Sequence, residues 1–164
     1  HRKNLLRKET THVGLGVAGN RTTNRTEWWL TQVFAEPVAR VRAEDGGSGL
    51  AARVQAARAR AELPALVEDS ALAAVARDGV LELASGGGEG VPQRLLADLR
   101  SRLPGREGLM VWAASTVNLA TLVLPEQLNT GTAQRFGLAV YQHPDHPHGL
   151  TGVVIVTSAA DGGR

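Results

Sequence analysis

The stretch HRKNLLRKETTHVGLGVA, residues 1–18, decides the fold because it returns later in the chain. It is typical of a short basic helix, a turn and a strand. Shifted by 123 positions it reappears in weaker form, with residues 14–17 falling on residues 137–140. The next strand also repeats, since residues 30–34 align within one residue with residues 152–157. This pattern indicates two copies of one unit, of which only the second has a front half.

The same stretch carries a family resemblance. The motifs His-Arg-x-Asn-Leu-Leu, His-x-Gly-x-Gly-Val and, after a loop, Trp-x-Thr-Gln-Val-Phe together resemble the closing segment of a CAP domain. This superfamily includes cysteine-rich secretory proteins, antigen 5 proteins and plant pathogenesis-related proteins, with a bacterial branch that lacks disulfides. Residues 60–76 resemble the first two helices of the same domain. The resemblance implies an α+β fold, a three-layer α-β-α sandwich with a mainly antiparallel sheet.

The resemblance also implies where a functional site would lie. In CAP domains two His and two Glu line a central cleft that can hold a divalent metal. By resemblance His1 is one of these four residues, and the other three are expected upstream of it. In the second unit Leu124 aligns with His1, while residues 81–92 contain no His and residues 108–118 no carboxylate. The second unit is therefore expected to keep the fold without the site, which favours binding over catalysis.

Composition suggests four segments. We predict that residues 1–38 are the C-terminal helix and hairpin of a truncated CAP-like unit and that residues 39–49 are a linker, because the latter end in Glu-Asp-Gly-Gly-Ser-Gly. Residues 50–159 are predicted to be a degenerate CAP-like domain, followed by a tail at residues 160–164. Both faces of the second hairpin strand carry large side chains, so cover on both sides is expected.

A lone hairpin is marginal in water, and we therefore expect this one to pack against the second unit through Trp28 or Trp29. In the second unit, the first helix has an apolar stripe through Leu50 and Val54, which places its arginines on a solvated face. The predicted elements are helices at residues 50–62, 70–84 and 92–103, a short helix at residues 122–129, and strands at residues 108–118, 135–143 and 150–158.

Several classes of function are disfavoured by composition. A net charge of +2, with arginines spread along the 164 residues, argues against nucleic acid as a partner. The chain has no Cys, which excludes disulfides and cysteine chemistry. No apolar run reaches the ~20 residues of a membrane span. We expect no signal peptide within the given residues, and because residue 1 is not Met we expect it not to be a translation start.

The loop at residues 143–148 is a second candidate site. His143, Asp145, His146 and His148 place three imidazoles and a carboxylate close together, a donor set that suits Zn²⁺ or Ni²⁺. Its imidazoles would titrate near neutral pH and make the loop charge-sensitive. Two prolines and a spacing that matches no standard zinc site favour incidental loop composition instead.

Three functional hypotheses follow. The leading one is a non-enzymatic binding module of an exported bacterial protein, extracellular or in the cell envelope, with a cell-surface polymer, a protein or a lipid as partner. The alternative is a metal-dependent hydrolase whose remaining site residues lie upstream of His1. The third is a metal- or pH-responsive loop at residues 143–148. The location is implied by the family resemblance alone.

Overall fold

The computed structural model describes residues 11–23, 25–35, 40–86, 88–143 and 149–159. The chain divides into two compact units, residues 1–39 and residues 40–164. The first unit contains an antiparallel hairpin of β1 (His12–Arg21) and β2 (Thr26–Ala35), both predicted from the sequence. The short helix predicted at the start of the chain, from residue 2 to residue 8, lies outside the described residues.

The second unit is built around a four-stranded sheet with the order β3-β5-β6-β4. Its strands are β3 (Val67–Glu68), β4 (Met110–Thr116), β5 (Arg135–Gln142) and β6 (Thr151–Ser158). Strand β3 runs parallel to β5, and the other pairs are antiparallel. The predicted strands at the C-terminal end agree with β5 and β6 to within one residue.

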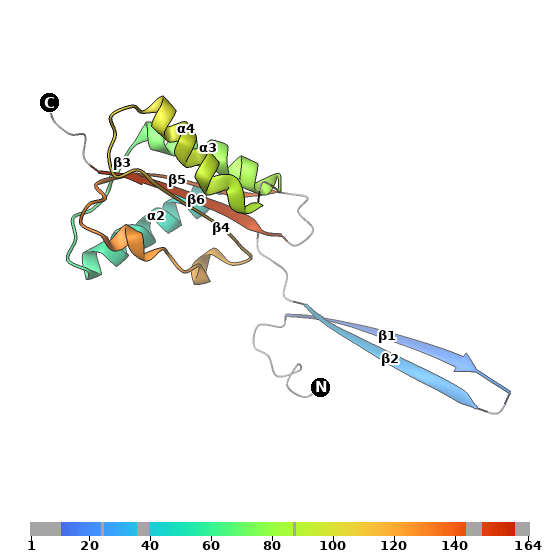
Figure 1. Ribbon diagram of the computed structural model, residues 1–164. Helices are drawn as coiled ribbons and strands as arrows, with labels where there is room; N and C mark the ends of the chain where they lie inside the picture. The colour runs from blue at the N-terminus through green and yellow to red at the C-terminus, as the bar shows by residue number, and fades with distance from the viewer. Residues whose placement is uncertain (1–10, 24, 36–39, 87, 144–148, 160–164) are drawn as a thin grey trace. The chain divides into compact units, whose positions relative to one another are not determined.

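Helices cover both faces of this sheet (Figure 1). Helices α3 (Ser70–Ala84) and α4 (Val91–Arg102), joined through the 3₁₀ turn η1 (Gly88–Gly90), lie on one face. Helix α2 (Ala43–Arg60) and the 3₁₀ turns η2 (Leu119–Thr121) and η3 (Glu126–Asn129) lie on the other. The architecture is therefore an α+β three-layer sandwich with a mainly antiparallel sheet, as the sequence predicts.

Strand β6 forms the centre of the hydrophobic core. Every residue from Thr151 to Ser158 is buried, because the strand has a neighbour on each edge and helices over both faces. Its run Val-Val-Ile-Val suits this position, since β-branched side chains pack well on a pleated surface that is covered on both sides. Val154 and Val156 pack beneath α3 and α4, whereas Val153 and Ile155 pack beneath α2.

Helix α2 begins at Ala43, so the predicted linker is wrong over residues 43–49. Among the glycines that suggested a linker, Gly46 is a point of close approach. A Cβ atom on Gly46 would lie 2.7 Å from the Val41 side chain and 3.1 Å from that of Val140. The helix can therefore pack tightly on β5 only with glycine at this position. Two acidic residues in the first turn also favour a helix start, because they complement the helix dipole.

The arginines of α2 are a second correction. Arg58 is only 1% exposed, so the predicted solvated arginine face is wrong there. Its guanidinium donates hydrogen bonds to four backbone carbonyls: Pro64 (2.7 Å), Leu128 (2.6 Å), Thr130 (3.0 Å) and Ala133 (3.1 Å). Burial lowers the pKa of Arg58 from its usual value. Arg53 is half-buried and donates to the carbonyls of Leu119 and Leu122, whereas Arg60 is exposed as predicted.

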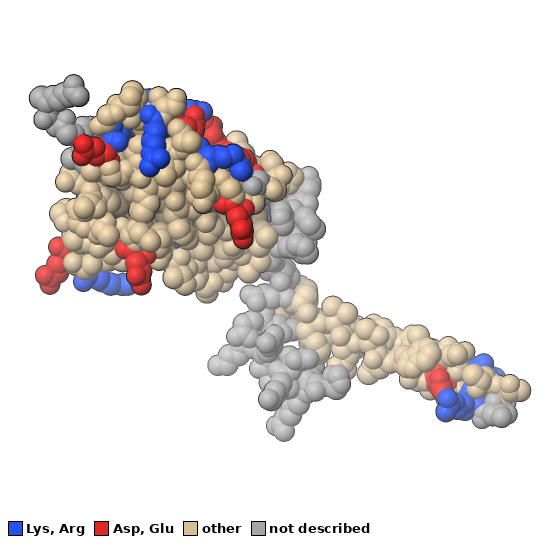
Figure 2. All heavy atoms as spheres, viewed as in Figure 1, with Lys and Arg blue, Asp and Glu red and all other residues tan. Residues whose placement is uncertain are grey.

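Charges on the second unit are mixed. Figure 2 shows acidic and basic side chains interspersed on the visible face of this unit, without a patch of one sign. In the described part of the chain no helix is both long enough and apolar enough to cross a bilayer.

Candidate functional site

The residues expected to form a CAP-type metal site are not tested by the described structure, which shows only the corresponding positions of the second unit. His1 lies outside the described residues. Leu124, which aligns with His1 in the repeat, is half-buried and packs on the core beneath α2. Glu89, in η1, is exposed. Position 124, aligned with His1, therefore contributes core packing in place of a metal ligand, and Glu89 contributes solvated surface.

The histidine-rich loop is described only at its first residue. His143 is half-buried, and its ring meets that of Tyr141 edge to face, with ring centroids 6.2 Å apart. Asp145, His146 and His148 lie outside the described residues, so the predicted metal loop stays a prediction. Among the residues that the structure describes, no three His, Asp or Glu side chains are grouped so that they could hold a metal ion.

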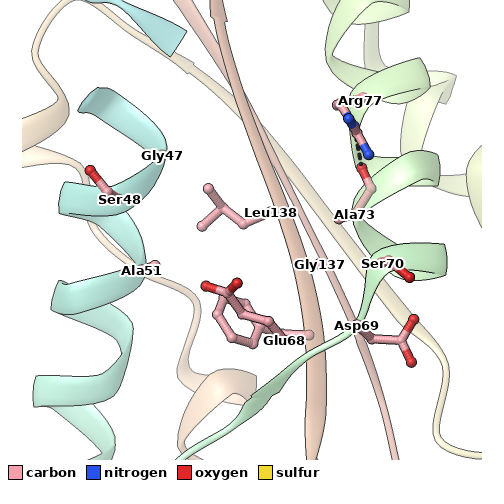
Figure 3. Close-up of a pocket in the computed structure, with 11 residues that line it drawn as sticks. Gly47, Ser48, Ala51, Glu68, Asp69, Ser70, Ala73, Arg77, Gly137 and Leu138 are labelled. Carbon is pink, nitrogen blue, oxygen red and sulfur yellow. Dashed lines mark hydrogen bonds between the residues drawn. The ribbon is translucent and has the colours of Figure 1, made fainter. Parts of the chain in front are cut away.

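A cavity of about 560 Å³ opens beside β5, between α2 and α3 (Figure 3). Its α2 wall is made of the small residues Gly47, Ser48 and Ala51, whereas α3 contributes the small residue Ala73 and the longer side chain of Arg77. Its volume lies within the range of ligand-binding pockets. Sequence analysis did not find this site, because small residues on a helix carry no signal that separates a cavity wall from ordinary close packing.

The cavity exists because β3 is only two residues long. The Asp69 N–H donates to Phe136 O at 2.9 Å, and the chain then turns away from the sheet into α3. Successive backbone N–H and C=O groups of a strand alternate between its two edges. The polar backbone groups of Leu138 therefore point to the same side as those of Phe136, away from β6. In the described residues no strand pairs with β5 on this side beyond Phe136.

Side-chain hydrogen bonds limit the open edge at its far end. The Val41 N–H donates to Gln142 Oε1 at 2.8 Å, and Gln142 Nε2 donates to Gly149 O at 2.8 Å. These bonds hold the segment before α2 against the end of β5. The free edge between Phe136 and Gln142 is thus short and bounded, with helices over both of its faces.

Asp69 anchors the start of α3 at the cavity. Its Oδ1 accepts hydrogen bonds from the N–H groups of Ala71 (2.9 Å) and Leu72 (3.1 Å), which caps the helix. Its Oδ2 lies 2.7 Å from Arg106 Nη1 and 3.5 Å from Arg135 Nη1. Burial by itself raises the pKa of Asp69, but the backbone hydrogen bonds and the Arg106 guanidinium outweigh it and leave the pKa lowered.

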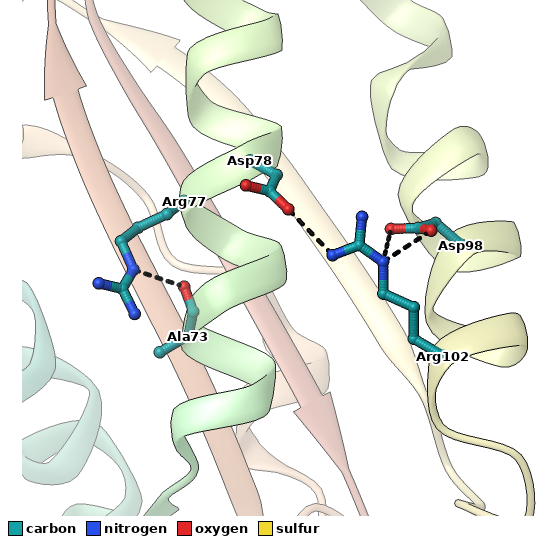
Figure 4. A network of polar contacts seen from close by, with 5 residues as sticks. All are labelled: Ala73, Arg77, Asp78, Asp98 and Arg102. Atoms are coloured by element: carbon teal, nitrogen blue, oxygen red, sulfur yellow. Dashed lines mark hydrogen bonds and ion pairs between the residues drawn. The ribbon is translucent and has the colours of Figure 1, made fainter.

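A polar network ties the outer side of α3 to α4 (Figure 4). Arg102 on α4 lies 3.1 Å from Asp78 Oδ2 on α3 and 2.9 Å from Asp98 on its own helix. Arg77, which lines the cavity, donates to Ala73 O at 3.3 Å. Exposed ion pairs contribute little to stability, so the network adds little to the packing that holds α3 and α4 together.

The cavity offers backbone hydrogen-bonding groups flanked by charges of both signs. Glu68 and Arg77 line it and are exposed, and the Ser48 hydroxyl donates to Asp45 O at 3.2 Å. An open strand edge with a short wall on each side can accept one extended polypeptide strand, because backbone groups are its natural partners.

Comparison with known proteins identifies solved structures with a similar fold. No family model matches the sequence, and neither does any curated protein. An outer surface protein from Borrelia burgdorferi has a similar structure, with a TM-score of 0.60 and 16% identity over 75% of this chain and 98% of that one. A cysteine-rich secretory protein from Staphylococcus aureus matches with a TM-score of 0.54 and 14% identity, over 84% of this chain and 43% of that one. The fold is thus CAP-like, as the sequence resemblance implies.

Proposed function

We propose that residues 40–164 form a binding module of an exported bacterial protein, located outside the cell or in its envelope. The two similar structures support the location, since one belongs to an outer surface protein and the other to a secretory protein. The binding role rests on one observation, the cavity of about 560 Å³ along the free edge of β5.

The ligand class that suits this cavity best is an extended segment of another protein. The backbone N–H and C=O of Leu138 match the donor and acceptor spacing of an extended chain, which can add to this edge as a strand. Small wall residues leave room for the side chains that such a chain would direct toward each helix. Glu68 and Arg77 both line the cavity, so a bound segment that carries one basic and one acidic residue would complement it.

A lipid ligand has weaker support. A second cavity, beside Leu50 and Leu119 between α2 and η2, is lined mostly by apolar surface. Its volume is about 250 Å³, below the usual size of ligand pockets. Cell-surface polymers such as glycans lack the alternating donors and acceptors of a strand. Of the three partner classes expected from the sequence, protein is therefore the one that we propose.

The experiment is a selection of random ten-residue displayed peptides on the full 164-residue chain, followed by affinity measurement with synthetic copies. A Ser48→Trp variant should lose most of the affinity, because the indole would fill the cavity from α2. Ala56→Trp is the matched control, since Ala56 is exposed on the same helix and does not line the cavity. Equal affinity of the two variants would exclude the cavity as the binding site.

Backbone pairing can be tested separately by N-methylation of the selected peptide at alternate residues. Methyl groups on one set of alternate amides should abolish binding, whereas the other set should be tolerated, because only every second amide faces β5. A uniform loss along the peptide, or no loss at all, would contradict strand addition. If Ser48→Trp inhibits binding but the alternation is not seen, the peptide binds in the cavity without adding to β5 as a strand.

A further inference from the structure

The hairpin β1–β2 has two apolar faces without cover among the described residues of its own unit. The side chains of Leu15 and Trp28 are 68% and 70% exposed, and other large apolar side chains on both strands are more than half exposed. The charged residues of the described hairpin are next to its loop: Arg21, Arg25 and Glu27. Figure 2 shows the acidic and basic side chains of the hairpin gathered at one end. Isolated two-stranded hairpins are marginal in water, and apolar patches of this kind mark interaction surfaces.

The pairing register of β1–β2 matches that of the hairpin β5–β6 in the second unit. In the first unit Gly14 pairs with Val33, and in the second Gly137 pairs with Val156. Both residues of the pair are displaced by 123 positions. The neighbouring pairs obey the same displacement: Gly16 with Thr31 in one hairpin corresponds to Ala139 with Val154 in the other. The same displacement fits both strands. The segment between the two strands therefore has the same length in both hairpins, and each face of β1–β2 corresponds to one face of β5–β6.

The counterpart hairpin β5–β6 shows what such faces bind. A Cβ atom on Gly137 would lie 2.1 Å from Ala73 N, so the first turn of α3 rests directly on this glycine. The opposite face carries Leu138, which approaches Gly47 of α2. Because the two hairpins have the same register, Gly14 corresponds to Gly137 and lies where an α3-like helix would pack. Leu15 then lies on the face of an α2-like helix.

We propose that β1–β2 is the central hairpin of another CAP-like unit, and that its faces bind the helical half of that unit, carried by polypeptide N-terminal to residue 1. The chain order supports this occupant, because in the second unit all three helices and β4 precede β5. Helix α2 begins at Ala43, which the displacement of 123 places roughly 80 residues upstream of residue 1. The staphylococcal secretory protein, of which this chain covers 43%, is long enough for such a preceding segment.

The test compares two substitutions in the polypeptide as it occurs in the native source, with its intact mass and N-terminal sequence determined first. Gly14→Ala should lower the melting temperature by about 5 °C or more, because its new methyl group would meet helix backbone as one at Gly137 would. Gly16→Ala is the matched control. It should be tolerated, since its counterpart Ala139 already carries a methyl group in the same setting.

The 164-residue chain supplies a second comparison. In it a Cβ at Gly14 meets only the Val33 side chain, at 3.9 Å, so Gly14→Ala should leave the melting temperature unchanged. A native polypeptide without a helical segment upstream would overturn the proposal. So would equal effects of the two substitutions in the native polypeptide. If Gly14→Ala is destabilising in the 164-residue chain alone, the occupant is the second unit or a second copy, and the proposed occupant is wrong.

Discussion

Replacement of Arg58 by alanine should destabilise the second unit by about 3–5 kcal/mol, because buried carbonyl oxygens would lose their donors and a large buried side chain would be removed. The side chain is 1% exposed and donates to four carbonyl oxygens at 2.6–3.1 Å. Hydrogen bonds to charged groups contribute about 1.5–3 kcal/mol each, but they are not additive when they share one donor group. The loss of all four therefore amounts to less than their sum.

The size of this destabilisation depends on the hydrogen-bond donors that the carbonyl oxygens would lose. Leu128 and Ala133 are themselves buried, so their oxygens cannot reach water when the guanidinium is removed. Each unsatisfied buried group costs about 1–3 kcal/mol. Native domains are stable by only about 5–15 kcal/mol, which means that the variant would lose a large part of its stability. Arg58→Lys should be intermediate, because one ammonium group cannot reach four oxygens.

The assay is urea denaturation of the 164-residue chain, followed by far-ultraviolet circular dichroism. Arg60→Ala is the control, since Arg60 lies two positions along the same helix and is exposed. Its effect should stay within about 0.5 kcal/mol. A midpoint for Arg58→Ala that equals the midpoint for Arg60→Ala would refute the assignment of Arg58 as a buried anchor of α2.

Three further predictions concern other parts of the chain. The pKa of Asp69 is lowered in the folded state, so its carboxylate stabilises the fold above its unfolded pKa of about 3.9, and this stability is lost as pH falls through the folded pKa. Asp69→Asn should therefore reduce the loss of stability in acid. The measurement is the free energy of unfolding as a function of pH. Gly137→Ala should lower the melting temperature strongly, whereas Gly131→Ala should not, because nothing lies within 4 Å of a Cβ at Gly131. If the histidine-rich loop binds Zn²⁺, calorimetric titration should show weaker binding after joint His146→Ala and His148→Ala substitution, and unchanged affinity would dismiss the loop as a metal site.

Much of the second unit was predictable because its core elements have clear periodicity. Helix α3 matches its predicted bounds, since Asp69 caps it and an apolar stripe runs along it to Ala84. The start of α2 was missed because glycine and serine are typical of linkers, and the close approach of Gly46 to Val140 is visible only in the structure. Arg58 was misplaced because a helical pattern ranks arginine as solvent-facing, whereas four distant carbonyls create a buried site for it.

The candidate site was not predictable in the same way. The cavity depends on the short length of β3, and two residues carry no periodic signal. It also depends on backbone groups of Leu138, which are the same in every sequence. The match between the two hairpins, by contrast, was visible in the sequence, and their pairs Gly14 with Val33 and Gly137 with Val156 differ by the same displacement in both strands.

The central claim is that the free edge of β5 receives an extended polypeptide. Amide hydrogen exchange at Leu138, measured by NMR with and without a selected ten-residue peptide, tests it most directly. We expect the Leu138 amide to exchange fast in the free protein and slowly in the complex. The Val154 amide on the central strand β6 should exchange slowly in both. A Leu138 amide whose exchange is the same with and without bound peptide would contradict the account.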